Sequence, residues 1–224
     1  MKKNSFCKQA VHTPAVCLSA LTVGVLAVSV AELCLGPQSY SLPQLWNAFV
    51  QQSAADPVWR VLAYVRIPRL FAGLLAGAAL AVAGTLLQAV LNNAMASPNV
   101  IGVNSGAGFF ALLAAALAPE ALGAAQFASF LGALGCAMLV YGLARLTGLS
   151  RTTLVLSGLA VSGMFSAGIN IIRLLWPESV SSAPSFLVGG LSGVTLKMLL
   201  FALPYLFAGA ILAFWIDTDL NVLC

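Results

Sequence analysis

Polar residues that could line a path or break a helix gather in one stretch of an otherwise apolar chain. Between Leu70 and Pro119 the sequence has no Asp, Glu, Lys or Arg, yet asparagine, serine, glycine and proline occur at its middle. At membrane depth, such backbone is tolerated only where protein or water satisfies its amide groups. An ordinary cytoplasmic turn, with Ser97 or Asn99 capping the next helix, explains the same residues. The polar or helix-breaking residues of this stretch are Asn92, Asn93, Ser97, Pro98, Asn99, Gly102, Asn104, Ser105 and Gly106.

Serines beside glycines, at Ser105, Ser157 and Ser162, raise the possibility of a membrane enzyme. A serine nucleophile needs a base, but the single histidine, His12, lies near the amino terminus and no lysine falls within a predicted span. We therefore interpret these serines as small helix-packing residues. The five cysteines show no paired spacing, and no nucleotide-binding glycine loop occurs. We expect no enzymatic activity, no cofactor, no protein-held metal and no nucleic-acid partner.

The elements that must position these residues are membrane spans. Of 224 residues, 61% are hydrophobic and 7% charged, and the mean hydropathy is +1.00, which excludes a soluble globular domain. Runs that are apolar on every face indicate helices rather than barrel strands. The sequence predicts an all-α integral membrane protein with about six spans, near 14–35, 68–91, 100–118, 122–145, 152–175 and 198–216.

Charge gives the orientation only in part. Basic residues near the amino terminus place it in the cytoplasm, although a cleaved signal peptide would share this pattern. The opposite side then collects Arg60, Arg66, Arg69, Arg173 and Lys197. Snorkelling of long side chains to lipid headgroups is one explanation of that cluster.

Four blocks of residues follow one another along the chain. Together they resemble the FecCD-type permeases of bacterial ABC importers, which carry iron–siderophore chelates, haem or vitamin B12. The resemblance runs from Trp59 to Leu223 and is closest to the ferric-citrate branch. Ala94 departs from it, because the family usually has proline there. The blocks are Arg66-Ile67-Pro68-Arg69, Gly77 to Gln88, Asn93 to Gly106, and Leu156 to Ser162 followed by Phe186 to Gly193.

The resemblance implies a single transmembrane permease domain over 1–224, corresponding to the first part of a ten-helix importer permease. It implies transport of a ferric chelate, with haem or vitamin B12 as alternative cargoes. Its partners would be an ATP-binding ABC subunit, a periplasmic substrate-binding protein, a second permease subunit and membrane lipid, in the bacterial inner membrane. Because the chain stops at Cys224, before the family's ATPase-coupling loop, an inactive truncated permease is the alternative. We then expect the chain alone to support no uptake.

The resemblance also implies roles for particular residues. Arg66 and Arg69 would dock the binding protein, and Pro98 with Gly102 would form a hinge between the second and third spans. The translocation path would be lined by Gln88, Asn92, Asn93, Asn104, Ser105, Gly189 and Gly190, the last two within the segment Phe186–Gly193.

Overall fold

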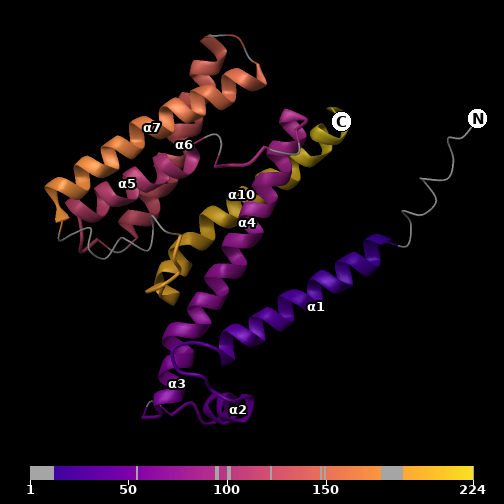
Figure 1. Cartoon of the computed structure of the whole chain (residues 1–224), viewed down its shortest axis with the longest axis vertical. Helices are drawn as coiled ribbons and strands as arrows, with labels where there is room; N and C mark the ends of the chain where they lie inside the picture. The colour runs from indigo at the N-terminus through magenta and orange to yellow at the C-terminus, as the bar shows by residue number, and fades with distance from the viewer. Residues whose placement is uncertain are drawn as a thin grey trace, which may run out of the picture. The chain divides into compact units, whose positions relative to one another are not determined.

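The computed structural model describes residues 13–53, 55–93, 96–99, 102–121, 123–146, 148, 150–177 and 189–223. Within these ranges the regular structure is helical and contains no strand, so the predicted all-α fold is confirmed (Figure 1). The chain divides into two compact units, Met1–Phe71 (unit 1) and Ala72–Cys224 (unit 2). We describe each unit separately.

Unit 1 contains α1 (Thr13–Cys34), α2 (Leu42–Gln51), α3 (Pro57–Val61), the π-helical turn η1 (Leu62–Arg66) and the beginning of α4 (Ile67–Leu91). Local signals set these limits. The Gln44 side chain accepts a hydrogen bond from the Ser41 N–H at 2.9 Å, which caps α2. The Asp56 carboxylate accepts one from the Val58 N–H at 2.9 Å, and Pro57 occupies the first helical position of α3.

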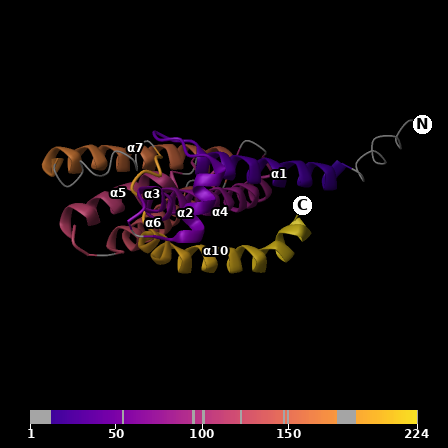
Figure 2. The same cartoon turned by 90° about the horizontal axis from the view of Figure 1, so that it is seen from below.

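Unit 2 contains the remainder of α4, then α5 (Val103–Leu117), α6 (Ala124–Leu146), α7 (Arg151–Leu175) and α10 (Leu196–Leu223). Figures 1 and 2 both show α5, α6 and α7 side by side, and these helices contact one another. Their core has two clusters of buried side chains, and Phe109 of α5 packs against both. The clusters are Leu112, Ile169 and Ile172, and Cys136, Val140, Val161 and Phe165.

Five of the six predicted spans correspond to helices long and apolar enough to cross a membrane. The exception is the segment predicted at 100–118, where α5 has only 15 residues. That length reaches about 22 Å, less than the roughly 30 Å of hydrocarbon. The polar residues before Val103 remain in the loop rather than extending the helix.

The second span begins earlier than predicted. The start near residue 68 was predicted because the spans were placed in uncharged intervals, and Arg66 and Arg69 lie at this boundary. The helical segment instead runs over Pro57–Leu91, 35 residues. Its backbone widens into the π turn η1, which ends at Arg66, two residues before Pro68, and such a turn accommodates a residue that cannot donate to the ladder.

Candidate functional site

The polar stretch of the sequence forms the connection between α4 and α5. Helix α4 ends at Leu91, and Asn92 follows in a left-handed conformation (φ 43°) and donates its N–H to the Ala89 carbonyl at 3.1 Å. Asn93 then donates its N–H to the Gln88 carbonyl at 3.0 Å. Asparagine tolerates the left-handed region better than other residues with a Cβ, which explains this helix end. Asn92, Asn93 and Gln88 are exposed.

Neither Ser97 nor Asn99 caps α5, contrary to the simple-turn interpretation. Gly102 occupies the cap position without a side-chain hydrogen bond. The Asn99 side-chain oxygen instead accepts a hydrogen bond from the Asn104 side-chain Nδ2, across the start of the helix. Asn104 is exposed, whereas Ser105 is half-buried, so these two predicted path residues differ in access.

Gly102 lies closely packed between α6 and α7. Its φ is +78°, and a Cβ there would approach the Gly158 carbonyl oxygen to 2.7 Å and would also overlap the Ser162 hydroxyl. Its own carbonyl accepts a hydrogen bond from the Cys136 thiol at 3.2 Å. Only glycine satisfies both the backbone angle and the space. The predicted hinge residue therefore anchors the start of α5, and Pro98, half-buried, precedes it.

Replacing Gly102 with alanine is expected to displace the start of α5 and to increase labelling of a cysteine placed at Ser105 by about fivefold, the equivalent of roughly 1 kcal/mol. A membrane-impermeant maleimide would measure this in a chain that keeps Cys136, which is buried against Gly102, and lacks its other natural cysteines. Gly163→Ala, on α7 with open space around it, is the control and should leave labelling unchanged. Equal labelling in all three chains would show that Gly102 does not position α5.

Glycines also bring α5 and α6 into direct backbone contact. A Cβ on Gly106 would lie 2.6 Å from the Cys136 Cβ, and one on Gly132 would lie 2.6 Å from the Gly106 carbonyl oxygen. On α7, the Ser162 hydroxyl donates to the Gly158 carbonyl at 2.8 Å, within its own helix. This geometry agrees with the packing role inferred for the glycine-adjacent serines.

The remaining predicted path residues, Gly189 and Gly190, are exposed, and Gly189 has a φ of +73°. Their neighbours at 186–188, and Ala94 in the α4–α5 connection, lie outside the described residues. No group of three or more potential metal ligands occurs in the part of the chain that the structure describes.

The paired arginines of unit 1 have different surroundings. Arg66 is 5% exposed, and its guanidinium donates to the carbonyls of Leu33 and Gln38. The same group lies 4.8 Å from the centroid of the Tyr40 ring. Arg66 thus satisfies a carbonyl in the last turn of α1 and fixes the segment that follows.

Arg69 is exposed and forms an ion pair with Glu32, with 3.1 Å between the Arg69 Nε and the Glu32 Oε1. The Arg66 guanidinium is satisfied by backbone carbonyls within unit 1, and its role in docking stays a prediction. Sequence reasoning missed Glu32 and Tyr40 as partners. The motif marked both arginines, but nothing in it indicated which one is buried.

Comparisons with known proteins agree on one group. The model of the FecCD transport family matches residues 23–224. The chain is 30% identical to "Probable siderophore transport system permease protein YfiZ" of Bacillus subtilis, over 97% of the chain and 66% of that protein. It is 30% identical to the Fe(3+)-citrate import system permease protein YfmE of the same organism, over 79% of the chain and 50% of that protein.

A solved structure gives the same result for the fold. The chain is similar to a metal-chelate type ABC transporter in an inward-facing conformation, with a TM-score of 0.71 and 29% identity, over 93% of this chain and 64% of that one. The chain thus spans between half and two thirds of the length of these relatives.

Proposed function

Because the chain belongs to the FecCD transport family, we propose that it is the membrane-spanning permease subunit of an ABC importer for an iron(III)–siderophore or related ferric chelate. It is a multi-pass protein of the bacterial inner (plasma) membrane, with apolar helices of spanning length. The family match over residues 23–224 carries the proposal. Relatives named for siderophore and Fe(3+)-citrate transport support a ferric chelate as cargo. Others, named for cobalamin and hemin, make vitamin B12 and haem the alternatives.

The proposed partners follow from the importer class. An ATP-binding subunit would drive the change between inward and outward states, since a ligand shifts such an equilibrium only through contacts that differ between them. A periplasmic binding protein would deliver the chelate, and a second permease subunit, identical or different, would complete the pore. The chelator supplies the metal ligands, so the chain itself needs none.

For the path we propose the exposed polar residues at the α4–α5 connection. Gln88, Asn92, Asn93 and Asn104 place amide side chains at the ends of two consecutive helices. Amide groups can exchange hydrogen bonds with the polar surface of a chelate or with water. Half-buried Ser105 and the exposed glycines Gly189 and Gly190 are included as positions where backbone could approach the cargo. Anchored at Gly102, α5 would keep this connection in register.

The transport proposal is tested in the organism that carries the gene. Deletion should abolish ATP-dependent uptake of one ferric chelate, and the gene supplied on a plasmid should restore it. Radiolabelled ferric citrate, a ferric siderophore, haem and cobalamin are measured in parallel. If only cobalamin uptake or only haem uptake is lost, that compound is the cargo in place of a ferric chelate. Unchanged uptake of all four would contradict the proposal.

For docking of the binding protein, we propose Arg69 as the contacting group and Arg66 as the residue that positions the surface. Arg69→Glu is expected to lower the association rate of the binding protein about tenfold at low ionic strength, because opposite charges steer encounter. The difference should shrink in high salt. Surface plasmon resonance on the purified permease measures the association rate at low and at high salt.

Arg145→Glu, at an exposed residue near the end of α6, makes the same change in net charge and is the control. A similar loss of rate in both variants would show a general charge effect rather than docking at Arg69. Arg69→Gln, which adds no negative charge, should give a smaller decrease of the same kind.

A further inference from the structure

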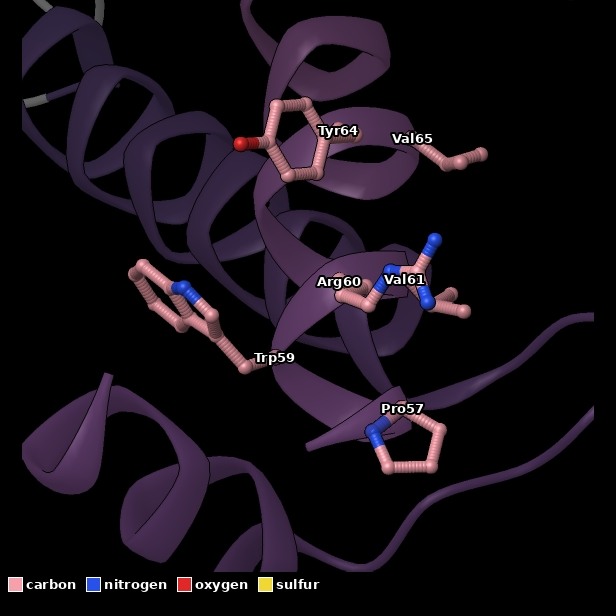
Figure 3. Close-up of a pocket in the computed structure, with 6 residues that line it drawn as sticks. All are labelled: Pro57, Trp59, Arg60, Val61, Tyr64 and Val65. Atoms are coloured by element: carbon pink, nitrogen blue, oxygen red, sulfur yellow. The ribbon is translucent and has the colours of Figure 1, made fainter. Parts of the chain in front are cut away.

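A pocket of about 620 Å³ lies along the α3–η1 helix of unit 1. Figure 3 shows the rings of Trp59 and Tyr64 on one side of this helix and the Arg60 side chain on the other. The Trp59 ring contacts Phe49 of α2, with 6.2 Å between the ring centroids. The pocket therefore adjoins α2. Its lining residues are Pro57, Trp59, Arg60, Val61, Tyr64 and Val65.

The last turn of α1 marks the level at which the hydrocarbon ends in unit 1. Arg66 donates to the Leu33 carbonyl in that turn, and Arg69 forms its ion pair with Glu32 of the same turn. Because charged side chains are costly in hydrocarbon, these residues lie at the end of both spans. With the amino terminus in the cytoplasm, as its basic residues predict, this end faces the periplasm.

The Arg60 pocket lies farther from the membrane than this level. Helix α4 alone has 25 residues, about 37 Å, which already exceeds the roughly 30 Å of hydrocarbon. The five residues each of α3 and η1 continue the same helix outward. Arg60 is about 9 Å beyond Arg66 along the helix axis, whereas the headgroup layer is roughly 5–7 Å thick. The Arg60 guanidinium is therefore in water, out of reach of an acyl chain.

The neighbouring helix α2 adds exposed apolar side chains to this part of unit 1. It buries Leu45 and Ala48, whereas the Trp46 ring on its other side is 68% exposed. Exposed apolar surface in water marks an interaction site, and Trp and Arg are the residue types that most often dominate contacts between proteins. Trp46 and Arg60, with the apolar residues beside them on α2 and α3, are named the α2–α3 surface.

The α2–α3 surface also carries a positive charge that the described part of unit 1 does not neutralise. Arg69 and Arg66 already have partners, and the Asp56 carboxylate accepts a backbone N–H as the cap of α3. Arg60 has no ion pair among the described residues. A protein that covers this surface must therefore offer a carboxylate to Arg60, since a buried cation without a partner is costly.

From these observations we propose that the α2–α3 surface is a second contact site for the periplasmic binding protein and holds it after Arg69 has attracted it. An acidic lobe of that protein would place a carboxylate on the Arg60 guanidinium and an apolar side chain against Trp46. The inference rests on the proposed function, in which the binding protein is the periplasmic partner. The ATP-binding subunit acts on the other side of the membrane, and a second permease subunit packs through its spans.

The two contacts should differ in kinetics. An exposed charge such as Arg69 mainly changes the association rate, whereas a desolvated anchor mainly changes the dissociation rate. Surface plasmon resonance would follow the ferric-chelate binding protein of the same organism on the whole chain in phosphatidylcholine nanodiscs. Trp46→Ala and Arg60→Gln should each raise the dissociation rate about tenfold and change the association rate less than about threefold.

Trp215→Ala and Arg145→Gln are the matched controls, because both residues are exposed and lie in unit 2, outside this surface. They should leave both rates unchanged. A dissociation rate in Trp46→Ala and Arg60→Gln equal to that of the parent or of the controls would overturn the proposal.

Uptake separates this inference from the proposed function. If the gene restores uptake of a ferric chelate but the parent chain does not bind the binding protein, the inference is wrong and the proposed function stands. If the gene supports no uptake, the proposed function is contradicted and this inference falls with it.

The position of α2 outside the bilayer can be measured without any partner. A bimane label on Trp46→Cys, in a chain that keeps only the buried Cys136, should be quenched by iodide in the water and not by lipids with brominated chains. Val23→Cys, at an exposed residue in the middle of α1, is the control and should show the opposite pattern. Quenching of the Trp46→Cys label by brominated chains would place α2 in the bilayer and reject the proposal.

Discussion

Gly132→Ala is expected to destabilise unit 2 by about 1–3 kcal/mol, the usual cost of inserting a methyl group into a packed core. The added Cβ would lie 2.6 Å from the Gly106 carbonyl oxygen and 2.7 Å from the Phe110 ring. The first of these atoms is backbone, so α5 and α6 would have to separate. Unfolding in a denaturing detergent, followed by circular dichroism, measures the change in free energy.

Gly135→Ala is a matched control on the same helix, because nothing lies within 4 Å of a Cβ at that position. It should be neutral or slightly stabilising, since alanine has the higher helix propensity. If the two variants unfold alike, the contact between α5 and α6 contributes no measurable stability. Gly106→Ala tests the same contact from the facing helix and should behave like Gly132→Ala.

Arg66→Leu is expected to destabilise unit 1 by about 2–5 kcal/mol. The change removes the donors for the Leu33 and Gln38 carbonyls, and a hydrogen bond to a charged group contributes about 1.5–3 kcal/mol. It also removes the contact with the Tyr40 ring. Loosening of the end of α1 should appear as faster maleimide labelling of Cys34, which is half-buried in the parent.

Arg69→Leu is the control for the Arg66 prediction. The Arg69–Glu32 pair is exposed, and such pairs contribute about 0–1 kcal/mol. Labelling of Cys34 should therefore stay close to that of the parent. Arg66→Lys should fall between the two, because one ammonium group cannot reproduce the fork of a guanidinium. An Arg66→Leu chain as stable as Arg69→Leu would mean that the buried guanidinium does not hold α1.

The limits of prediction from the sequence are clear at several residues. Charge-free intervals located the long helices in the part of the chain that the structure describes, because each residue placed in hydrocarbon adds to the transfer free energy regardless of its neighbours in space. The second span begins earlier than predicted because the helix continues through Arg60, Arg66 and Arg69, whereas the prediction began it at the end of that charged stretch. The π turn η1, which ends at Arg66, lets the helix continue past Pro68. The polar connection was located correctly, but its cap was not Asn99. Gly102 occupies the cap position, because Gly158 and Ser162 on α7 leave no room there for a side chain.

The sequence by itself determined the class, the helices and the family of this protein. Composition, hydropathy and four ordered motifs each depend on residues close together along the chain, and the match over residues 23–224 confirms the family. Only the tertiary structure decided which of two residues of the same type is buried or in close contact. It buried Arg66 and left Arg69 exposed, although one motif contains both, and it made Gly132 a contact while Gly135 faces open space. The physical reason is that burial, satisfied carbonyls and close helix approach depend on partners supplied by distant segments.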